Sequence, residues 1–504
     1  MSFKLYTTLL LLVFIGSFQN AQSANILALV INGHQSHLLV YSSVVNLLVQ
    51  RGHNVTVITT LDIKDVMDVE NIKWLKLSNN YTETVITTRS NRINPLDKLE
   101  RMIKRLENTS KFMNDPQWHA FLKKENQYDL LIMGYLFNDY QLGYGAYFKC
   151  PVVLIWTGQP IGFVQSLMGN PEERWYVTQP YDSHQFKGIK AIVFGWFEKF
   201  VELLALDKMK QIYNKQFPAK QYPSFKEIRK SVSLVLCNHH TLSEGPIAPY
   251  LPSIIDIGGI ESKLTSLENK FNLNSFIEPN ENVIYFSFGS RVKWSLLPIA
   301  LEQAFIEAFQ NFSNYTILWT YDKNCSELEL KFPLSNVKCK SWWLQSTILN
   351  SSHTKLFITH GGKGSMTESL WYGKPMLGIS FFGDQRANVD KIVKKGFGLK
   401  LQIGNITCEN VLKSLKQLLG NDIYGTNIKK FSKLYHDRPL GSEKSAVYWL
   451  EYVLRHKGAK HLQSMALELN FMEYYLLDIY GLILVSFLSI LWILNILEKK
   501  LKQQ

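Results

Sequence analysis

Cysteine and runs of basic residues are scarce in this chain. Its 504 residues include five cysteines and no C-x-x-C pair, which excludes a disulfide-rich scaffold, a zinc finger and a thioredoxin-like site. Basic residues exceed acidic ones by 55 − 42 = 13, but they are dispersed, so nucleic acid is not an expected partner. With 46% hydrophobic and 19% charged residues the chain is globular, not disordered.

The N-terminus has the pattern of a secretory signal peptide. Lys4 precedes an apolar run over residues 9–15, and small polar residues follow up to Ala24. We place the signal peptide at residues 1–23. A membrane anchor is the alternative, but the apolar run is too short to span a bilayer.

The C-terminus predicts a membrane anchor. Residues 479–497 carry no charge, and a helix of this length nearly crosses a hydrocarbon core of ~30 Å. Residues 456–478 form a juxtamembrane segment, and the lysines of the tail 498–504 place that tail in the cytosol. Lys500 and Lys502 match the K-x-K-x-x pattern of retrieval signals. We expect a single-pass type I protein of the endoplasmic reticulum membrane with luminal domains; a plain stop-transfer flank is the alternative reading of these lysines.

A luminal location would expose asparagines to glycosylation and cysteines to oxidation. Because the number of cysteines is odd, at least one thiol stays unpaired in an oxidising compartment. Eight N-x-S/T sequons permit glycosylation: Asn54, Asn80, Asn108, Asn311, Asn314, Asn324, Asn350 and Asn405.

Apolar runs that alternate with helical patterns organise the rest of the chain. The run from Asn25 to Ile31, a helix from about His37 to Gln50 and a strand over 55–58 form a βαβ start, which is typical of a Rossmann-like half. Further strands are expected at 130–133, 152–155, 232–236, 283–288, 316–319, 356–359 and 376–379. The sequence therefore predicts two doubly wound α/β domains that face one cleft, at 24–260 and 281–455, joined by a linker at 261–280.

Residues 189–206 form an amphipathic helical pattern that includes Trp196, Phe197 and Phe200. Such a helix can lie on a membrane surface, or it can pack in the core or over the cleft. The pattern leaves both alternatives open.

The stretch from Leu356 to Ile392 carries the most informative motif. A buried strand ends at Thr359, and His360, Gly361 and Gly362 lead into a helix that begins near Ser365. Glycines at a helix N-terminus let the backbone approach an anion, which the free N–H groups and the helix dipole stabilise. The sequence predicts a phosphate site here.

Polar residues beside this phosphate site suit a sugar nucleotide. Glu368 can accept two ribose hydroxyls, while Asp384 and Gln385 stand at the carboxyl edge of the sheet, where open α/β folds bind ligands. A carboxylate next to an amide suits the hydroxyls of a sugar ring.

This stretch closely resembles the UDP-glycosyltransferase family, which includes the animal UDP-glucuronosyltransferases. Their signature reads roughly F-x-T-H-G-G-x-x-S-x-x-E, then P, then G-D-Q, and it is matched from Phe357 to Gln385. The resemblance covers the mature chain, including the segments 257–259 and 448–458. It implies the GT-B architecture of two facing Rossmann-like domains, the single C-terminal span and a glycoprotein with a role in detoxification.

The resemblance also implies roles for residues of the donor site. Ser290, His360, Gly362 and Ser365 match phosphate-contacting positions, and Trp342 matches the tryptophan that stacks on uracil. Gln345 lies near the base, Glu368 binds the ribose, and Asp384 with Gln385 binds the sugar. This chain departs from the family pattern at Leu344, where proline is usual, and at Gly364, where an asparagine often contacts phosphate.

His37 matches the catalytic histidine of the family, which takes a proton from the acceptor hydroxyl. His34, three residues earlier, is the rival candidate. The aspartate that orients this histidine usually ends a strand that here reaches Gly134. Asp139 is the nearest replacement; a helix cap or a surface acid is the alternative reading of it.

The sequence therefore predicts an inverting glycosyltransferase that moves a hexose from a UDP-sugar to a small lipophilic acceptor. No metal or cofactor is implied, because the UDP-sugar is a co-substrate. Glucose is favoured over glucuronate, since no arginine can be assigned to a uronate carboxylate. Homo-oligomerisation is left open. The acceptor pocket is expected among aromatic residues of the N-terminal half: Tyr135, Phe137, Trp156, Phe163 and Trp175.

Two alternatives belong to other classes. One is a non-catalytic membrane protein that binds a UDP-sugar or a glycan, with Gly134 marking a broken catalytic pair. The other is a nicotinamide oxidoreductase, which is disfavoured because no G-x-G-x-x-G follows the first strand.

Overall fold

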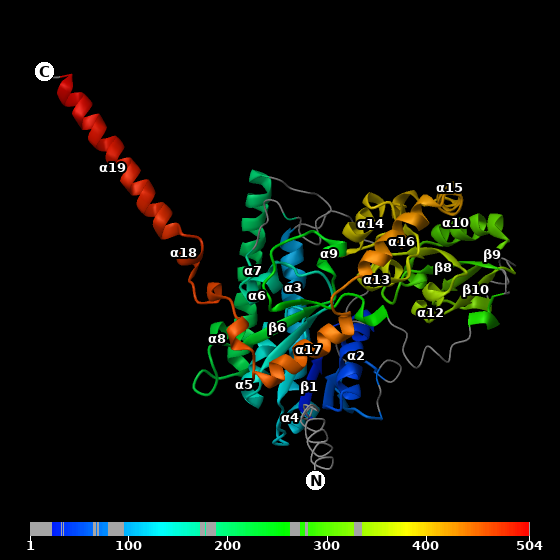
Figure 1. The fold of residues 1–504 in the computed structure, drawn as a ribbon, viewed down its shortest axis with the longest axis horizontal. Helices are drawn as coiled ribbons and strands as arrows, with labels where there is room; N and C mark the ends of the chain where they lie inside the picture. Colours follow the sequence, from blue (N-terminus) through cyan, green and yellow to red (C-terminus); the bar gives the residue numbers. More distant parts are fainter. Residues whose placement is uncertain are drawn as a thin grey trace, which may run out of the picture.

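Two open parallel sheets with helices on both faces form the two halves of the molecule (Figure 1). The predicted α/β fold with two Rossmann-like domains is confirmed. Most of the predicted signal peptide and linker lies outside the described residues. The computed structural model describes residues 23–31, 33, 35–63, 67, 70–78, 95–171, 177, 188–262, 273–277, 281–326 and 335–502.

The N-terminal domain has a seven-stranded sheet in the order β3-β2-β1-β4-β5-β6-β7. Its strands are β1 (Asn25–Val30), β2 (Asn54–Thr59), β3 (Lys73–Lys76), β4 (Leu130–Gly134), β5 (Val152–Trp156), β6 (Val232–Cys237) and β7 (Ile254–Asp256). Its helices are α2 (Gln35–Gln50), α3 (Pro95–Ser110), α4 (Pro116–Leu122), α5 (Gly143–Phe148), α6 (Gly162–Met168), α7 (Ile189–Gln216), α8 (Phe225–Lys230) and α9 (Thr241–Glu244). The strand order reverses between β1 and β4, so ligands are expected at the carboxyl ends of these two strands.

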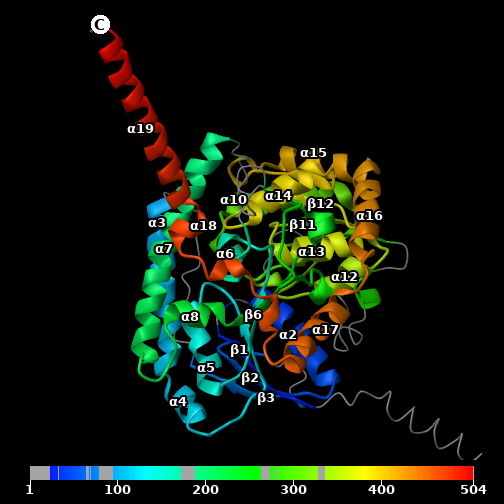
Figure 2. The same cartoon turned by 60° about the vertical axis from the view of Figure 1, so that its left-hand side comes forward.

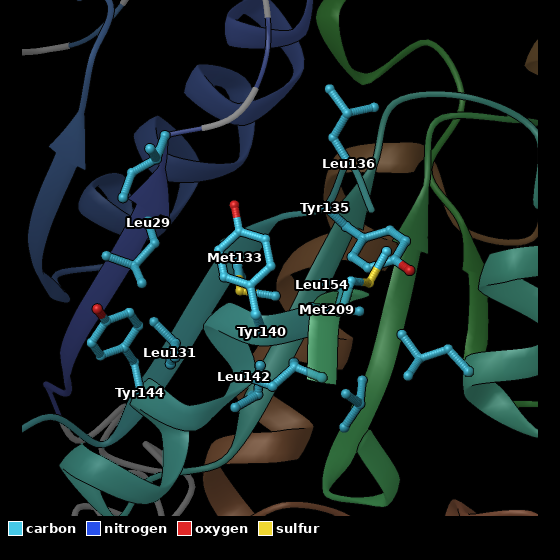
Figure 3. Close-up of a cluster of buried hydrophobic side chains, with 14 of the residues drawn as sticks. Leu29, Leu131, Met133, Tyr135, Leu136, Tyr140, Leu142, Tyr144, Leu154 and Met209 are labelled. Carbon is cyan, nitrogen blue, oxygen red and sulfur yellow. The ribbon is translucent and has the colours of Figure 1, made fainter. Parts of the chain in front are cut away.

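Alternate residues of the central strands enter different core layers, because successive side chains of a strand point to opposite faces. In β1, Leu27 packs into the layer of α4 to α8, whereas Ile26 packs into the layer of α2. Figure 3 shows the first layer, where Tyr135, Tyr140 and Met209 are buried together. Because helices cover both faces of this sheet, its strands appear in the sequence as continuous apolar runs.

The C-terminal domain has a six-stranded sheet in the order β10-β9-β8-β11-β12-β13. Its strands are β8 (Asn282–Ser287), β9 (Tyr315–Thr320), β10 (Val337–Lys340), β11 (Thr354–Thr359), β12 (Met376–Gly378) and β13 (Gly398–Lys400). Its helices are α10 (Ile299–Phe309), α12 (Gln345–Asn350), α13 (Lys363–Tyr372), α14 (Gln385–Lys394), α15 (Cys408–Leu419) and α16 (Ile423–His436). All nine predicted strands are present, and the four strands that were not predicted are the edges of the two sheets.

The chain returns to the N-terminal domain after α16. Helix α17 (Ser442–Arg455) packs beside α2 (Figure 2) and buries Ala446, Leu450 and Val453 in the α2 layer. The predicted domain boundary at residue 455 is therefore wrong, because the apolar face of α17 completes the N-terminal core.

The predicted juxtamembrane segment is also held on the N-terminal domain. The Gln463 amide donates to the Lys230 carbonyl at 2.6 Å, and the Ser464 hydroxyl donates to the Gly169 carbonyl at 2.9 Å. These contacts fix the base of the last helix against the domain.

Helix α19 (Leu477–Leu501) extends away from both domains (Figure 1). It is long and apolar enough to cross a membrane, and its apolar window is not buried in the protein. It contains the predicted span 479–497.

The first half of α7 exposes apolar side chains next to the base of α19. The Trp196 ring lies 6.2 Å from that of Phe471, in α18 (Phe471–Tyr474), and 5.3 Å from that of Tyr475. Packing in the core therefore does not account for these exposed residues: Ile189, Ile192, Val193, Trp196, Phe197, Phe200, Leu203 and Leu204.

Cys325 and Cys339 form a disulfide between the loop after β9 and β10. Cys150, Cys237 and Cys408 are free thiols, which agrees with the expectation that at least one cysteine stays unpaired.

Two truncations should separate the roles of the C-terminal helices. Removal of residues 477–504 should leave a folded, soluble protein, because α19 buries nothing in either domain. Removal of 442–504 should cause aggregation, since it strips Leu450 and Val453 from the core. Secreted yield and a cooperative thermal transition are the measurements. A folded, soluble 442–504 deletion would contradict the assignment of α17 to the core.

Candidate active site

The N-terminus of α13 faces the cleft directly after the carboxyl end of β11. Gly361 has φ +76°, and a Cβ atom there would lie 2.5 Å from Val389 Cγ2. Gly362 is the N-cap and supplies no side-chain cap. The first turn thus presents backbone N–H groups without intrahelical partners, as an anion site requires. The helix begins two residues before the predicted Ser365.

His360 is enclosed between two glycines. Cβ atoms at Gly289 and Gly362 would lie 2.6 and 2.4 Å from its ring. Burial lowers the pKa of His360 to about 4, so the ring is neutral near pH 7. Its Nδ1 atom is buried and lacks a hydrogen-bond partner within the described part of the chain. A neutral imidazole can still donate one hydrogen bond, but it adds no positive charge until it is protonated.

Gln345 at the start of α12 lies together with Ser365 and Glu368 on the first two turns of α13. The Gln345 amide donates to the Glu368 carboxylate at 2.6 Å and to the Ser365 hydroxyl at 3.3 Å. The Glu368 side chain is buried. Three residues assigned to base, phosphate and ribose therefore form one connected group.

Asp384 and Gln385 lie at the start of α14. Burial raises the pKa of Asp384, while the Asn388 amide, which donates to its carboxylate at 2.7 Å, acts in the opposite direction. The Gln385 carbonyl oxygen accepts from the N–H groups of Phe381 and Phe382 at 2.8 and 3.0 Å. Gln385 thus shapes this loop, and its NH₂ group remains as the donor suited to a sugar.

One pocket of about 220 Å³ joins the two domains. Ser290 and Trp342 line it from the C-terminal domain, and Gln35, the first residue of α2, lines it from the N-terminal domain. Trp342 is 49% exposed, so its ring face is accessible to a planar base. The sequence analysis did not single out Gln35, because a lone glutamine carries no motif.

His37 stands on the first turn of α2, two residues after Gln35, and hence at the edge of this pocket. Gly33 packs on it: a Cβ atom there would lie 3.2 Å from His37 Nδ1. The rings of His37 and Tyr41 meet edge to face, with centroids 6.5 Å apart. The rival His34 lies outside the described residues.

Tyr41 occupies the space in front of Gly134. A Cβ atom at Gly134 would lie 2.8 Å from Tyr41 Cζ, so the position that carries aspartate in the family pattern admits no side chain here. Tyr41 is buried and its hydroxyl has no hydrogen-bond partner in the described structure. The chain has an aromatic ring where the family pattern implies a carboxylate.

Asp139 does not replace that carboxylate, and this prediction is corrected. Its two oxygens accept from the Tyr135 hydroxyl at 2.8 Å and from Arg229 Nε at 2.7 Å. Tyr135 belongs to the core layer on the face of the sheet opposite to α2. The fully buried Asp139 compensates the Arg229 charge and is not a surface acid.

Polar contacts cross between the domains beside the donor site. Lys363 Nζ donates to the Glu244 carboxylate, and the Tyr435 hydroxyl donates to the other oxygen of that carboxylate at 3.1 Å. Lys391 Nζ donates to the Gln159 side-chain carbonyl at 3.3 Å. None of these residues was predicted. The charge of Lys363 within the motif from Phe357 to Gln385 could have indicated a functional residue. No feature of the sequence distinguishes Glu244.

Four predicted acceptor-side aromatics form one cluster at the carboxyl ends of β4 and β5. The ring centroids of Phe137 lie 4.8 Å from Phe163 and 6.0 Å from Trp156, and Tyr135 lies 6.1 Å from Trp156. Trp175 lies outside the described residues.

These features define a class. Two parallel sheets form two domains that share one pocket. A glycine-rich helix start follows β11 in one domain, and His37 stands two residues after the pocket residue Gln35 in the other. This is the arrangement of a nucleotide-sugar glycosyltransferase with the GT-B fold.

Comparison with known proteins gives the family. The model of the family "UDP-glucoronosyl and UDP-glucosyl transferase" matches residues 176–502, and the chain belongs to this family of UDP-glycosyltransferases. UDP-glucosyltransferase 2 of Dactylopius coccus is 28% identical over 99% of this chain and 97% of its own. A UDP-glucuronosyltransferase of Pleuronectes platessa is 29% identical over 69% of this chain and 74% of its own.

A solved structure supports the fold. The glycotransferase of kitacinnamycin superposes with a TM-score of 0.60 at 14% identity, covering 86% of this chain and 100% of that one. At this identity the likeness shows the GT-B fold alone.

We predict that Asp139→Asn lowers the free energy of unfolding and does not directly affect the catalytic step. It leaves Arg229 buried without its counter-charge, which should cost roughly 3–5 kcal/mol. The control is Asp390→Asn, which breaks an exposed pair with Lys400 and should cost about 0–1 kcal/mol. Thermal and denaturant unfolding measure both. Normal stability of Asp139→Asn together with a large loss of turnover would restore Asp139 as a catalytic candidate.

The pH dependence of donor affinity should report His360. Burial depresses the pKa of His360 to about 4. A bound anion that contacts the ring raises this pKa, so donor binding is coupled to the uptake of a proton. The Kd for UDP-glucose should then fall as the pH drops below ~6.5, by at most about tenfold per pH unit. Calorimetric titrations of the wild type and His360→Gln measure this. Identical pH profiles for the two proteins would show that His360 does not contact the diphosphate.

Proposed function

We propose that this UDP-glycosyltransferase moves a hexose, glucose in preference to glucuronate, from the UDP-sugar to a small lipophilic acceptor with inversion at the anomeric carbon. The single supporting observation is the pocket that Gln35 shares with Ser290 and Trp342. It brings the turn that carries His37 to the donor site. No cofactor or metal enters the proposal, because the UDP-sugar is a co-substrate.

In the proposed reaction His37 takes the proton of the acceptor hydroxyl while its oxygen attacks the anomeric carbon. The bond from that carbon to the diphosphate oxygen breaks on the opposite side, and UDP leaves. The α13 N-terminus and His360 stabilise the charge that develops on UDP. Binding both substrates in one cleft supplies the positioning. Tyr41 supports the His37 ring in place of a carboxylate.

The preference for glucose is supported by the charges in the sugar region. Asp384 lies at the start of α14, and Glu244 neutralises the nearby Lys363. A uronate carboxylate would therefore meet acidic groups. The lipophilic acceptor is supported by the half-buried rings of Phe137 and Phe163, which pack on each other, and by the packing of Phe137 on the buried Trp156.

Turnover tests this proposal. Membranes with the wild-type chain, offered UDP-glucose or UDP-glucuronate and a panel of phenols, should form mainly glucosides. His37→Ala should lower kcat by at least ~10²–10⁴, the range of acid–base assistance, while the Kd for UDP stays unchanged. Mass spectrometry and calorimetry measure product and binding. A chain that binds UDP-sugar without transfer to any phenol would favour the non-catalytic alternative.

We further propose that α19 anchors the enzyme in the endoplasmic reticulum membrane with luminal domains, and that the apolar first half of α7 lies in the membrane interface. The exposed α7 side chains, and the packing of Trp196 on the base of α19, support this placement.

The lysines of the tail provide a test of location. Lys500→Ser with Lys502→Ser should let the intact protein leave the endoplasmic reticulum, because the retrieval pattern is lost while the span is kept. Acquisition of glycans resistant to endoglycosidase H measures this movement. Unchanged sensitivity would leave the lysines as a stop-transfer flank only.

A further inference from the structure

Lys363 links the donor site to the opposite domain. It is the first residue of α13, one residue after the N-cap, yet its side chain crosses the cleft to Glu244, the last residue of α9. Its side chain is 15% exposed and that of Glu244 is 4% exposed. A lysine on the first turn of the anion-binding helix is thus neutralised by a carboxylate of the other domain.

Glu244 is a fixed negative charge. Burial on its own would raise the pKa of Glu244, but Lys363 and His239 hold it well below its usual value. One oxygen accepts from the Tyr435 hydroxyl and the His240 N–H group, both at 3.1 Å. The carboxylate is therefore ionised beside Lys363, and the contacts of Tyr435 and His240 hold its other oxygen in place.

The surroundings of Lys363 leave room for an anion on its other side. The Asp384 carboxylate accepts a hydrogen bond from the Lys363 backbone N–H group. The turn is open on the side of Gly364, where a Cβ atom would meet nothing within 4 Å. The buried His360 ring packs against Gly362, the N-cap of the same helix, and its Nδ1 atom lacks a partner among the described residues. A diphosphate at this helix start would lie within the reach of a flexible lysine side chain.

We propose that Lys363 is a ligand of the donor diphosphate and that Glu244 competes with the diphosphate for it. Without donor, Glu244 holds the ammonium group and bridges the domains. With donor bound, the diphosphate draws the same ammonium group towards the α13 N-terminus and weakens this bridge. The inference rests on the proposed function, since it needs a UDP-sugar at α13.

The affinity for UDP tests the proposal through a double-mutant cycle on the full-length protein. Lys363→Met should weaken UDP binding by about 10- to 100-fold, as expected for the loss of a charged hydrogen bond. Glu244→Gln should tighten UDP binding by roughly 3- to 10-fold, because the competing charge is gone while an amide keeps the contacts. In the Lys363→Met background, Glu244→Gln should have no effect.

Matched controls separate charge competition from a loosened interface. Tyr435→Phe removes the other contact of Glu244 across the interface without changing a charge, and it should leave the Kd for UDP unchanged. Lys400→Met breaks an exposed pair in the same domain and should also bind UDP normally. The proposal is overturned if Glu244→Gln weakens UDP binding or leaves it unchanged, or if Tyr435→Phe tightens it equally.

Ionic strength provides a second readout should Glu244→Gln fail to fold. The affinity of Lys363→Met for UDP should then depend less steeply on salt than that of the wild type, since one cationic contact is lost. Equal salt dependence would overturn the proposal. If the wild type transfers sugar and Lys363→Met binds UDP normally, only this inference fails. If the wild type neither binds UDP nor transfers sugar, the proposed function fails as well.

Discussion

The close packing of the His360 ring between Gly289 and Gly362 is the contact on which the donor half of the site depends. Any side chain at either glycine would overlap the ring. The packing joins the loop after β8, which carries Ser290, to the start of α13. It also keeps water from the ring, which is why the pKa of His360 falls to about 4.

The acceptor half depends on a different kind of contact. Helix α2 presents Gln35 to the pocket and carries His37 two residues further on. Helix α17, from the far end of the chain, covers the core layer of α2. The helix that carries the candidate base is therefore held by residues about 400 positions away in the chain, and the Arg51–Glu451 contact beside it joins residues 400 positions apart. Tyr41 fills the space before Gly134, and its ring meets that of His37 edge to face.

Charge is distributed differently on the two faces of the N-terminal sheet. Asp139 and Arg229 form an ion pair on the α8 side of the core. Glu244 lies at the domain interface and forms an ion pair with Lys363. Both acids are buried and paired. Of these two acids, only Glu244 has an ion-pair partner, Lys363, that the donor diphosphate would also contact. The proposal therefore couples donor binding to Glu244 and not to Asp139.

The nine central strands, the glycine-rich helix start after His360 and the apolar C-terminal helix could all be predicted from the sequence, because each depends on local periodicity or on residues adjacent in the chain. The edge strands β3, β7, β10 and β13 were not predicted, because short edge strands have weak apolar patterns. Lys73 and Lys76, for example, are the first and last residues of the four-residue strand β3. Only the tertiary structure decided that Asp139 faces away from His37, that α17 joins the N-terminal core and that Glu244 meets Lys363. These pairings join residues 90 to 400 positions apart, and their geometry is fixed by packing that no local pattern encodes.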